Sequence, residues 1–251
     1  MPADQAQGLR RLFAHRRARL LGVVGVGATG LALEIARALA ARSERVLLLD
    51  GTCGDAAAAL GLAARYELRH VLAGHRTLAD VALAGPAGLT VLPAHRALAT
   101  LADAPVHDAE RVIAELDRAL DGVDMILVNG VPPALPQAGV LLSIAPTAAA
   151  ITLAYTELKI LSRRGQPKRC EVVIQSARNE AAALDAFDSV AITAGRFLGM
   201  SLALAGTLPP AGPAAGGAAG GATSSARSLA VLRIAERLTG DPATDRQAVN
   251  L

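Results

Sequence analysis

The amino-acid sequence predicts an α/β domain built on a doubly wound, mostly parallel β-sheet. Short apolar runs alternate with longer helical stretches along most of the chain, which is the pattern of strands joined by crossover helices. A glycine-rich turn separates the first apolar run from the first helical stretch. The 251 residues, of which 52% are hydrophobic, suffice for one large domain with a packed core.

The expected elements begin with a strand over residues 19–26, a helix over about 29–41, and a second strand over 45–49 that ends at Asp50. These strands are continuous apolar runs, as expected for a parallel sheet covered on both faces. Further strands are expected at 89–92, 125–128, 140–144, 171–175 and 202–205, with helices at 107–120, 148–164 and 180–198.

Composition argues against several classes of protein. Aromatic residues make up only 2% of the chain, so a nucleic-acid platform of stacked aromatic side chains is not expected. Cys53 and Cys170 are far apart and the histidines lack ligand spacing, so we expect neither a disulfide nor a metal site. Prolines interrupt the charge-free stretch 125–156, which therefore predicts strands and turns and not a membrane span. We also expect no secretory signal, and hence a cytoplasmic protein.

Composition also divides the chain into four segments. Residues 1–18 form a basic leader and residues 19–210 form the α/β domain. Residues 211–226 are small or polar and predict a flexible linker, because they bury too little side chain to offset ordering entropy. Residues 227–251 contain an amphipathic helix that docks on the domain or on another surface. Its expected apolar stripe consists of Leu229, Leu232, Ala235 and Leu238.

The glycine-rich turn runs from Gly25 to Gly30 and has the context of a phosphate-binding loop, in which backbone N–H groups and a helix N-terminus face an anion. One interpretation is a Rossmann dinucleotide site with Asp50 as the ribose partner. The spacing counts against it, because Gly30 comes one residue too early for G-x-G-x-x-G. A plain strand-to-helix turn without a ligand is a further alternative.

The sequence resembles, over about residues 3–210, the MinD/ParA family of deviant Walker-type ATPases, and within it the FlhG group of flagellar number and placement factors, also called YlxH or FleN. Residues 25–29 stand in register with the second half of the family P-loop, K-G-G-V-G-K-[ST]. Other matching segments follow in family order at 45–50, 66–74, 88–93, 146–148 and 155–159. The resemblance implies a doubly wound sheet of the P-loop NTPase (MinD/SIMIBI) type.

The resemblance also implies that the nucleotide site is degenerate. Val23 and Ala28 stand where the family has lysines, and Asn129 stands where the Walker B strand ends in aspartate. Gln175 replaces an adenine-binding asparagine, and part of the switch segment before residue 140 is missing. We therefore expect no catalytic residue, no metal and no resident cofactor, with weak binding of ATP and Mg²⁺ as the disfavoured alternative. The vestigial nucleotide-binding residues are Gly25, Val26, Gly27, Ala28, Thr29, Asp50, Asn129 and Gln175.

The leader is similar to the D-Q-A-x-x-L-R segment by which FlhG proteins contact FlhF, an SRP-type GTPase. The resemblance implies a short helix that docks on the GTPase and activates it through the Gln5 amide, which can orient an attacking water. A solvated basic leader and a membrane-surface helix are the alternatives. The expected partner-binding residues are Asp4, Gln5, Ala6, Leu9, Arg10, Leu12 and Phe13.

These observations predict a FlhG-like regulator of flagellum number and placement that acts by contact with an FlhF-type GTPase and is a pseudo-ATPase. Other flagellar basal-body or regulatory proteins are further expected partners, through which the protein reaches the cell pole or inner membrane. We expect no nucleic-acid binding and at most weak direct membrane contact. One alternative is a functional MinD/ParA-type ATPase that positions flagellar or other polar or envelope machinery. Another is a ParA-like partner of pilus or cellulose export.

Overall fold

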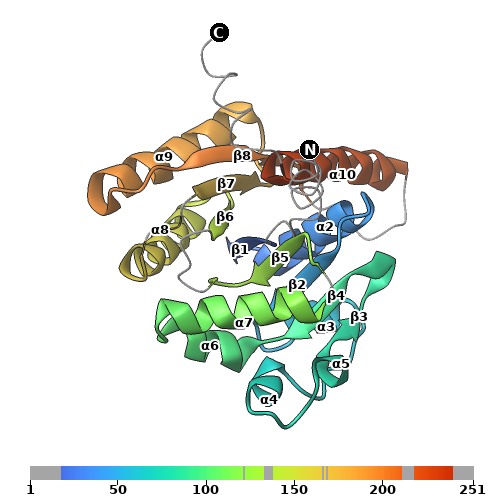
Figure 1. Cartoon of the computed structure of the whole chain (residues 1–251). Coiled ribbons are helices and arrows are strands. Elements are labelled where there is room, and N and C mark those ends of the chain that lie inside the picture. The colour runs from blue at the N-terminus through green and yellow to red at the C-terminus, as the bar shows by residue number, and fades with distance from the viewer. Residues whose placement is uncertain are drawn as a thin grey trace, which may run out of the picture.

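The computed structural model describes residues 18–120, 122–132, 138–165, 167, 169–210 and 218–239, with side chains in the last range from residue 225. One eight-stranded sheet runs through the molecule in the order β3-β4-β2-β5-β1-β6-β7-β8 (Figure 1). All neighbouring strands are parallel except β3 and β4. The strands are β1 (Arg19–Gly25), β2 (Val46–Asp50), β3 (Leu83–Ala84), β4 (Thr90–Pro93), β5 (Met125–Asn129), β6 (Gly139–Ile144), β7 (Arg169–Gln175) and β8 (Ala203–Leu208).

Helices cover both faces of the sheet, so the predicted doubly wound α/β class is confirmed (Figure 1). The four longer helices expected within the domain match their positions, whereas the short elements between β2 and β4 and the eight-residue helix at 95–102 were not predicted. The helices are α2 (Ala28–Ala40), α3 (Asp55–Ala59), α4 (Leu68–Leu72), α5 (Leu78–Val81), η1 (Pro86–Gly88), α6 (His95–Ala102), α7 (Val106–Ala119), α8 (Ala148–Arg163), α9 (Glu180–Leu198) and α10 (Ala218–Thr239).

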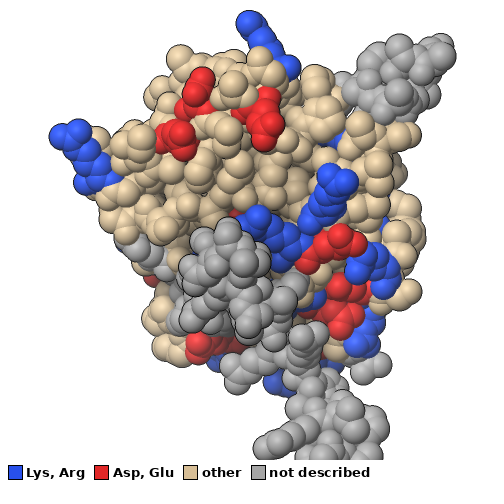
Figure 2. All heavy atoms as spheres, turned by 90° about the horizontal axis from the view of Figure 1, so that it is seen from above, with Lys and Arg blue, Asp and Glu red and all other residues tan. Residues whose placement is uncertain are grey.

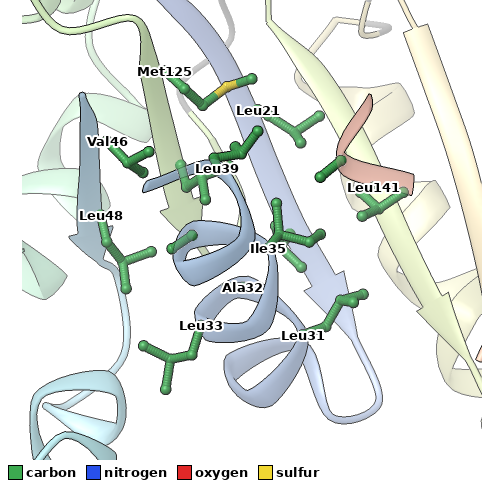
Figure 3. Close-up of a cluster of buried hydrophobic side chains, with 14 of the residues drawn as sticks. Leu21, Leu31, Ala32, Leu33, Ile35, Leu39, Val46, Leu48, Met125 and Leu141 are labelled. Atoms are coloured by element: carbon green, nitrogen blue, oxygen red, sulfur yellow. The ribbon is translucent and has the colours of Figure 1, made fainter. Parts of the chain in front are cut away.

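Alternate residues of each strand face opposite helical layers. In β1, Leu21 and Val23 pack with α2 and α10, whereas Leu20 packs with α6 and α7, and Val24 packs with α8 and α9. Figure 3 shows side chains of α2, among them Ile35, lying against those of β1, β2 and β5. All five residues of β2 and of β5 are buried, as in parallel sheets that have helices on both faces.

The C-terminal helix α10 corrects two expectations. It begins at Ala218, so the second half of the expected linker 211–226 is helical. Alanine favours the helix, and these residues extend a helix that is docked on the domain. Its buried apolar side chains are Val231, Ile234, Ala235 and Leu238, whereas Leu229 of the expected stripe is 58% exposed. Packing against α2 and β8 therefore buries a different apolar face of α10 from the one that the sequence predicted.

Seen from above, most of this face is uncharged; an acidic group lies toward the top of the view, and basic and acidic side chains lie next to one another to the right of centre (Figure 2). Across the described residues, none of the helices is both long and apolar enough for a membrane crossing.

Candidate functional site

The glycine turn lies at the carboxyl end of β1, in the middle of the sheet. Gly25 and Gly27 both have positive φ values, of 96° and 67°, and Gly27 is the N-cap of α2. A Cβ on Gly25 would lie 2.2 Å from the carbonyl oxygen of Ser143, so only glycine fits there. Val26 donates its N–H to that same carbonyl oxygen at 3.0 Å and accepts the Ser143 hydroxyl at 2.5 Å. The turn is thus tied to strand β6 by protein atoms.

A cavity of about 300 Å³ opens beside this turn; we call it the turn cavity. None of its described lining residues is lysine or arginine, and Glu157 of α8 places a carboxyl group in it. Partial burial raises the pKa of Glu157, because an ionised carboxylate loses hydration there. The cavity therefore has the shape of a phosphate cradle but not its charge. Its described lining residues are Val23, Val24, Gly25, Gly27, Ala28, Thr29, Thr52, Asn129, Gly130, Val131 and Glu157.

Asp50, at the end of β2, is fully buried and accepts five hydrogen bonds. Thr52 donates its N–H at 3.1 Å and its hydroxyl at 2.5 Å to Oδ1. The N–H groups of Ala56 and Ala57, at the start of α3, donate to Oδ2 at 3.1 and 3.3 Å. The side-chain amide of Asn129 donates to Oδ1 at 3.3 Å. These donors occupy the lone pairs of the carboxylate, so Asp50 holds the loop and α3 in place.

Asn129 connects Asp50 to the glycine turn. Its Nδ2 lies 3.2 Å from Oγ1 of Thr29 as well as 3.3 Å from Oδ1 of Asp50, and the side chain is 1% exposed. An aspartate at this place would put two carboxylates side by side, which is unfavourable without a cation or a shared proton. The amide makes the contact favourable in the protein alone. Around the turn, the described residues thus offer no lysine for phosphate, and the carboxylate of Asp50 is already engaged within the chain. Glu157 remains as a single carboxylate in the cavity lining, and without a cation for the phosphates these residues do not fit a magnesium–nucleotide site.

Gln175, at the end of β7, closes the turn from the other side. Its Nε2 donates to the carbonyl oxygen of Val26 at 3.0 Å and to the hydroxyl of Ser143, and its Oε1 accepts from Arg227 of α10 at 3.1 Å. Arg227 is 8% exposed and pairs with Glu34 of α2 at 2.8 Å. Both ends of the Gln175 amide are therefore engaged within the chain. An adenine base would have to displace one of these partners.

The structure brings the turn, Asp50, Asn129 and Gln175 to the same edge of the sheet, as the sequence positions at strand ends imply. The partner-binding residues expected in the leader lie outside the described residues. Sequence reasoning missed Ser143, Arg227 and Glu34. Arg227 has the sequence signal of an ordinary charge on an amphipathic helix, and its partners are 52 and 193 residues away.

Comparisons with known proteins agree with this fold. No family model matches the chain. Over 199 residues the chain is 29% identical to the antiactivator FleN of Pseudomonas aeruginosa, which covers 75% of this chain and 71% of FleN. The MinD cell division protein of Aquifex aeolicus superposes with a TM-score of 0.61 at 19% identity, covering 88% of this chain and 96% of MinD.

A second structural neighbour is the cobyrinic acid a,c-diamide synthase of Mycobacterium smegmatis with bound ADP and magnesium. Its TM-score is 0.59 at 18% identity, and the match covers 88% of this chain and 94% of the enzyme. The predicted resemblance to FleN (FlhG) proteins is confirmed, and the sheet has the architecture of the MinD/ParA P-loop ATPases.

Proposed function

We propose that this protein is a FlhG-like regulator of flagellum number and placement that acts by protein contact and does not turn over ATP. The similarity to the antiactivator FleN supports the regulatory role. The observation that carries the second half of the proposal is the network of Asp50, Asn129 and Thr29, which leaves the turn organised by protein groups alone. Neither ATP nor Mg²⁺ is a cofactor in this proposal.

The charge of the turn cavity supports the absence of ATP turnover. Phosphoryl transfer depends on cations that neutralise the β- and γ-phosphates, and the N-terminus of α2 supplies only about half a positive charge. Glu157 adds an acidic group to the lining of the cavity. A polyphosphate would therefore meet weak attraction from the helix and repulsion from a carboxylate.

The proposed partner is an FlhF-type GTPase, bound through Asp4, Gln5, Ala6, Leu9, Arg10, Leu12 and Phe13. The leader joins the domain next to Arg19, at the amino end of β1, whereas the turn lies at the carboxyl end of this strand. A seven-residue strand separates the two ends by roughly 20 Å. Activation of a partner by the leader thus needs no nucleotide in the turn cavity, and the folded domain serves to locate the leader.

The first test measures GTP hydrolysis by FlhF in the presence of a peptide of residues 1–19. We expect the peptide to stimulate hydrolysis, Gln5→Ala to bind but not stimulate, and Leu9→Asp to bind weakly because it puts a charge on the apolar stripe. Stimulation that survives Gln5→Ala, or binding without stimulation by the parent peptide, would contradict the proposed role of the leader.

The second test separates this proposal from its alternative, a functional MinD/ParA-type ATPase. The full chain with Mg²⁺ and ATP should release no phosphate above buffer, and Ala28→Lys should not restore turnover, because one cation cannot replace the missing carboxylate and switch. A magnesium-dependent ATPase signal that Gly27→Val abolishes would favour the alternative.

A further inference from the structure

A second cavity, of about 400 Å³, adjoins the turn cavity at the carboxyl edge of the sheet, and Thr52 lines both. We call it the arginine cavity. Three parts of the chain form it: the loop 52–54 after β2, the segment 64–70 that leads into α4, and residues 93–96 at the junction of β4 and α6. It takes no part in the network around the glycine turn described above, apart from this shared threonine.

The arginine cavity carries an excess of positive charge. Its lining includes Arg65, Arg69 and Arg96 but only one carboxylate, that of Glu67. Glu67 is already engaged, because Nε of Arg69 lies 2.6 Å from Oε1 and the backbone N–H of Arg96 donates to Oε2 at 3.1 Å. No carboxylate of the described residues lies within ion-pair distance of the guanidinium of Arg65 or Arg96. Two guanidinium groups thus remain available to an outside anion.

The aromatic side chains beside these arginines are held in fixed orientations. The guanidinium of Arg76 lies 4.4 Å from the ring centre of Tyr66 and donates to its hydroxyl at 2.9 Å. The ring of His70 packs edge-on against Tyr66 at 5.6 Å. Nδ1 of His70 lies 3.1 Å from both the backbone N–H and the carbonyl oxygen of Glu67, which fixes the orientation of the ring. The His70 ring is thus a held part of the cavity wall.

We propose that the arginine cavity binds the phosphate group of a small phosphorylated molecule. Guanidinium groups recognise phosphate through paired N–H donors, and the doubly charged group can engage Arg65 and Arg96 together. The volume falls within the range of small-ligand sites. This proposal goes beyond the FlhG-like function and does not depend on it.

The experiment titrates the full chain with inorganic pyrophosphate and, separately, with phenyl phosphate as a phosphomonoester, by isothermal calorimetry at low salt. The double variant Arg65→Gln/Arg96→Gln should weaken binding of both probes by about tenfold or more. The matched control is Arg111→Gln/Arg118→Gln, which removes the same charge from the exposed face of α7 and should leave affinity within about twofold, because the loss there is only of distant, screened charge.

A third variant, Thr29→Val, separates the arginine cavity from the turn cavity. Binding should be unchanged in it, because Thr29 lines only the turn cavity. The proposal is overturned if neither probe binds saturably, if both double variants weaken binding equally, or if Thr29→Val removes binding. It is likewise overturned if a hexaglutamate peptide binds more tightly than both probes with the same dependence on Arg65 and Arg96, since the ligand would then be an acidic protein segment. The phosphate tests give the same information whether or not the leader activates FlhF.

Discussion

Two neighbouring cavities share Thr52 at one edge of the sheet and differ in almost everything else. The turn cavity has a glycine-built backbone cradle and the N-terminus of a long helix, but its described lining holds no cation. The arginine cavity has three arginines and no such cradle. Backbone shape and charge, which a phosphate-binding loop normally combines, are thus found in separate places in this chain.

The polar groups of the two cavities also differ in whether they are satisfied. Around the turn, the side chains of Asp50, Asn129 and Gln175 are engaged with one another or with neighbouring groups of the chain. In the arginine cavity, by contrast, the guanidinium groups of Arg65 and Arg96 have no carboxylate partner among the described residues. A buried hydrogen-bond network that is complete without a ligand stabilises the fold, whereas an exposed charged side chain without an ion-pair partner is available to bind a ligand.

The largest effect is expected from Asp50→Ala, because it leaves several buried donors without an acceptor. We expect a loss of about 3 kcal/mol in the free energy of unfolding, measured by urea denaturation. The control, Asp55→Ala, removes an exposed carboxylate from the first turn of α3 and should cost about 0.5 kcal/mol. Equal losses in both variants would show that the network around Asp50 does not hold this edge of the sheet together.

A smaller effect is expected from Arg227→Met, which breaks the contact between α10 and Gln175 and leaves Glu34 without its partner. The loss should be about 2 kcal/mol, and amide exchange of residues 25–30 should accelerate. Arg42→Met is the matched control, because Arg42, in the turn that follows α2, also contacts α10, through Glu236 at 2.7 Å. That pair is exposed and should contribute about 0.5 kcal/mol or less. Unchanged exchange in Arg227→Met would contradict the role of α10 in organising the turn.

Asn129→Asp sharpens the comparison by restoring the family carboxylate next to Asp50. Repulsion raises the folded-state pKa of the pair above its unfolded value, so the variant should match the parent near pH 4 and lose stability as the pH rises, by about 1.5 kcal/mol at pH 7.5. Thermal unfolding at both pH values, with and without Mg²⁺, measures this. Full recovery of stability in Mg²⁺ would mean that the turn cavity still holds a metal site once its carboxylate returns.

The smallest effect is expected from Glu157→Gln in the wall of the turn cavity. Partial burial raises the pKa of Glu157 in the folded state, so its ionisation opposes folding increasingly as the pH rises through that value. Because the side chain is only partly buried, the gain in Glu157→Gln above pH 6 should be about 0.3 kcal/mol, and it should vanish at pH 4. A gain that is the same at both pH values would assign it to packing and not to charge.

The fold could be predicted from the sequence because its strands are apolar runs, buried on both faces, that alternate with helices long enough to show a period. The elements between β2 and β4 could not, since α4 and α5 span only five and four residues and carry too few turns for a periodic signal. The same limit applies to the face of α10. Its sequence permits several apolar stripes, and packing against α2 and β8 selects the one with Leu229 exposed.

For the candidate site, strand ends located Asp50, Asn129 and Gln175, because parallel strands bring their carboxyl ends to one edge. The partners of these residues could not be predicted, because they depend on which side chains meet across the fold. The arginine cavity shows the same limit. Arg65 and Arg96 are separated in the chain by four short elements that the sequence did not reveal, α4, α5, β3 and η1, and nothing local indicates that the two arginines line one cavity.

The contact between Arg227 and Gln175 has a consequence for the order in which the protein folds on the ribosome. The residues of the glycine turn are synthesised early, but the carbonyl oxygen of Val26 can accept its hydrogen bond only after Gln175, 149 residues later, has been synthesised. Gln175 in turn gains its contact with Arg227 only when the C-terminal helix is present. Contacts of such high sequence separation form late, after the loop between them has closed. Before α10 has emerged from the ribosome, the nascent chain will therefore expose the apolar surface of α2 and β8 that this helix later covers. Aggregation or chaperone binding should be greatest at this stage.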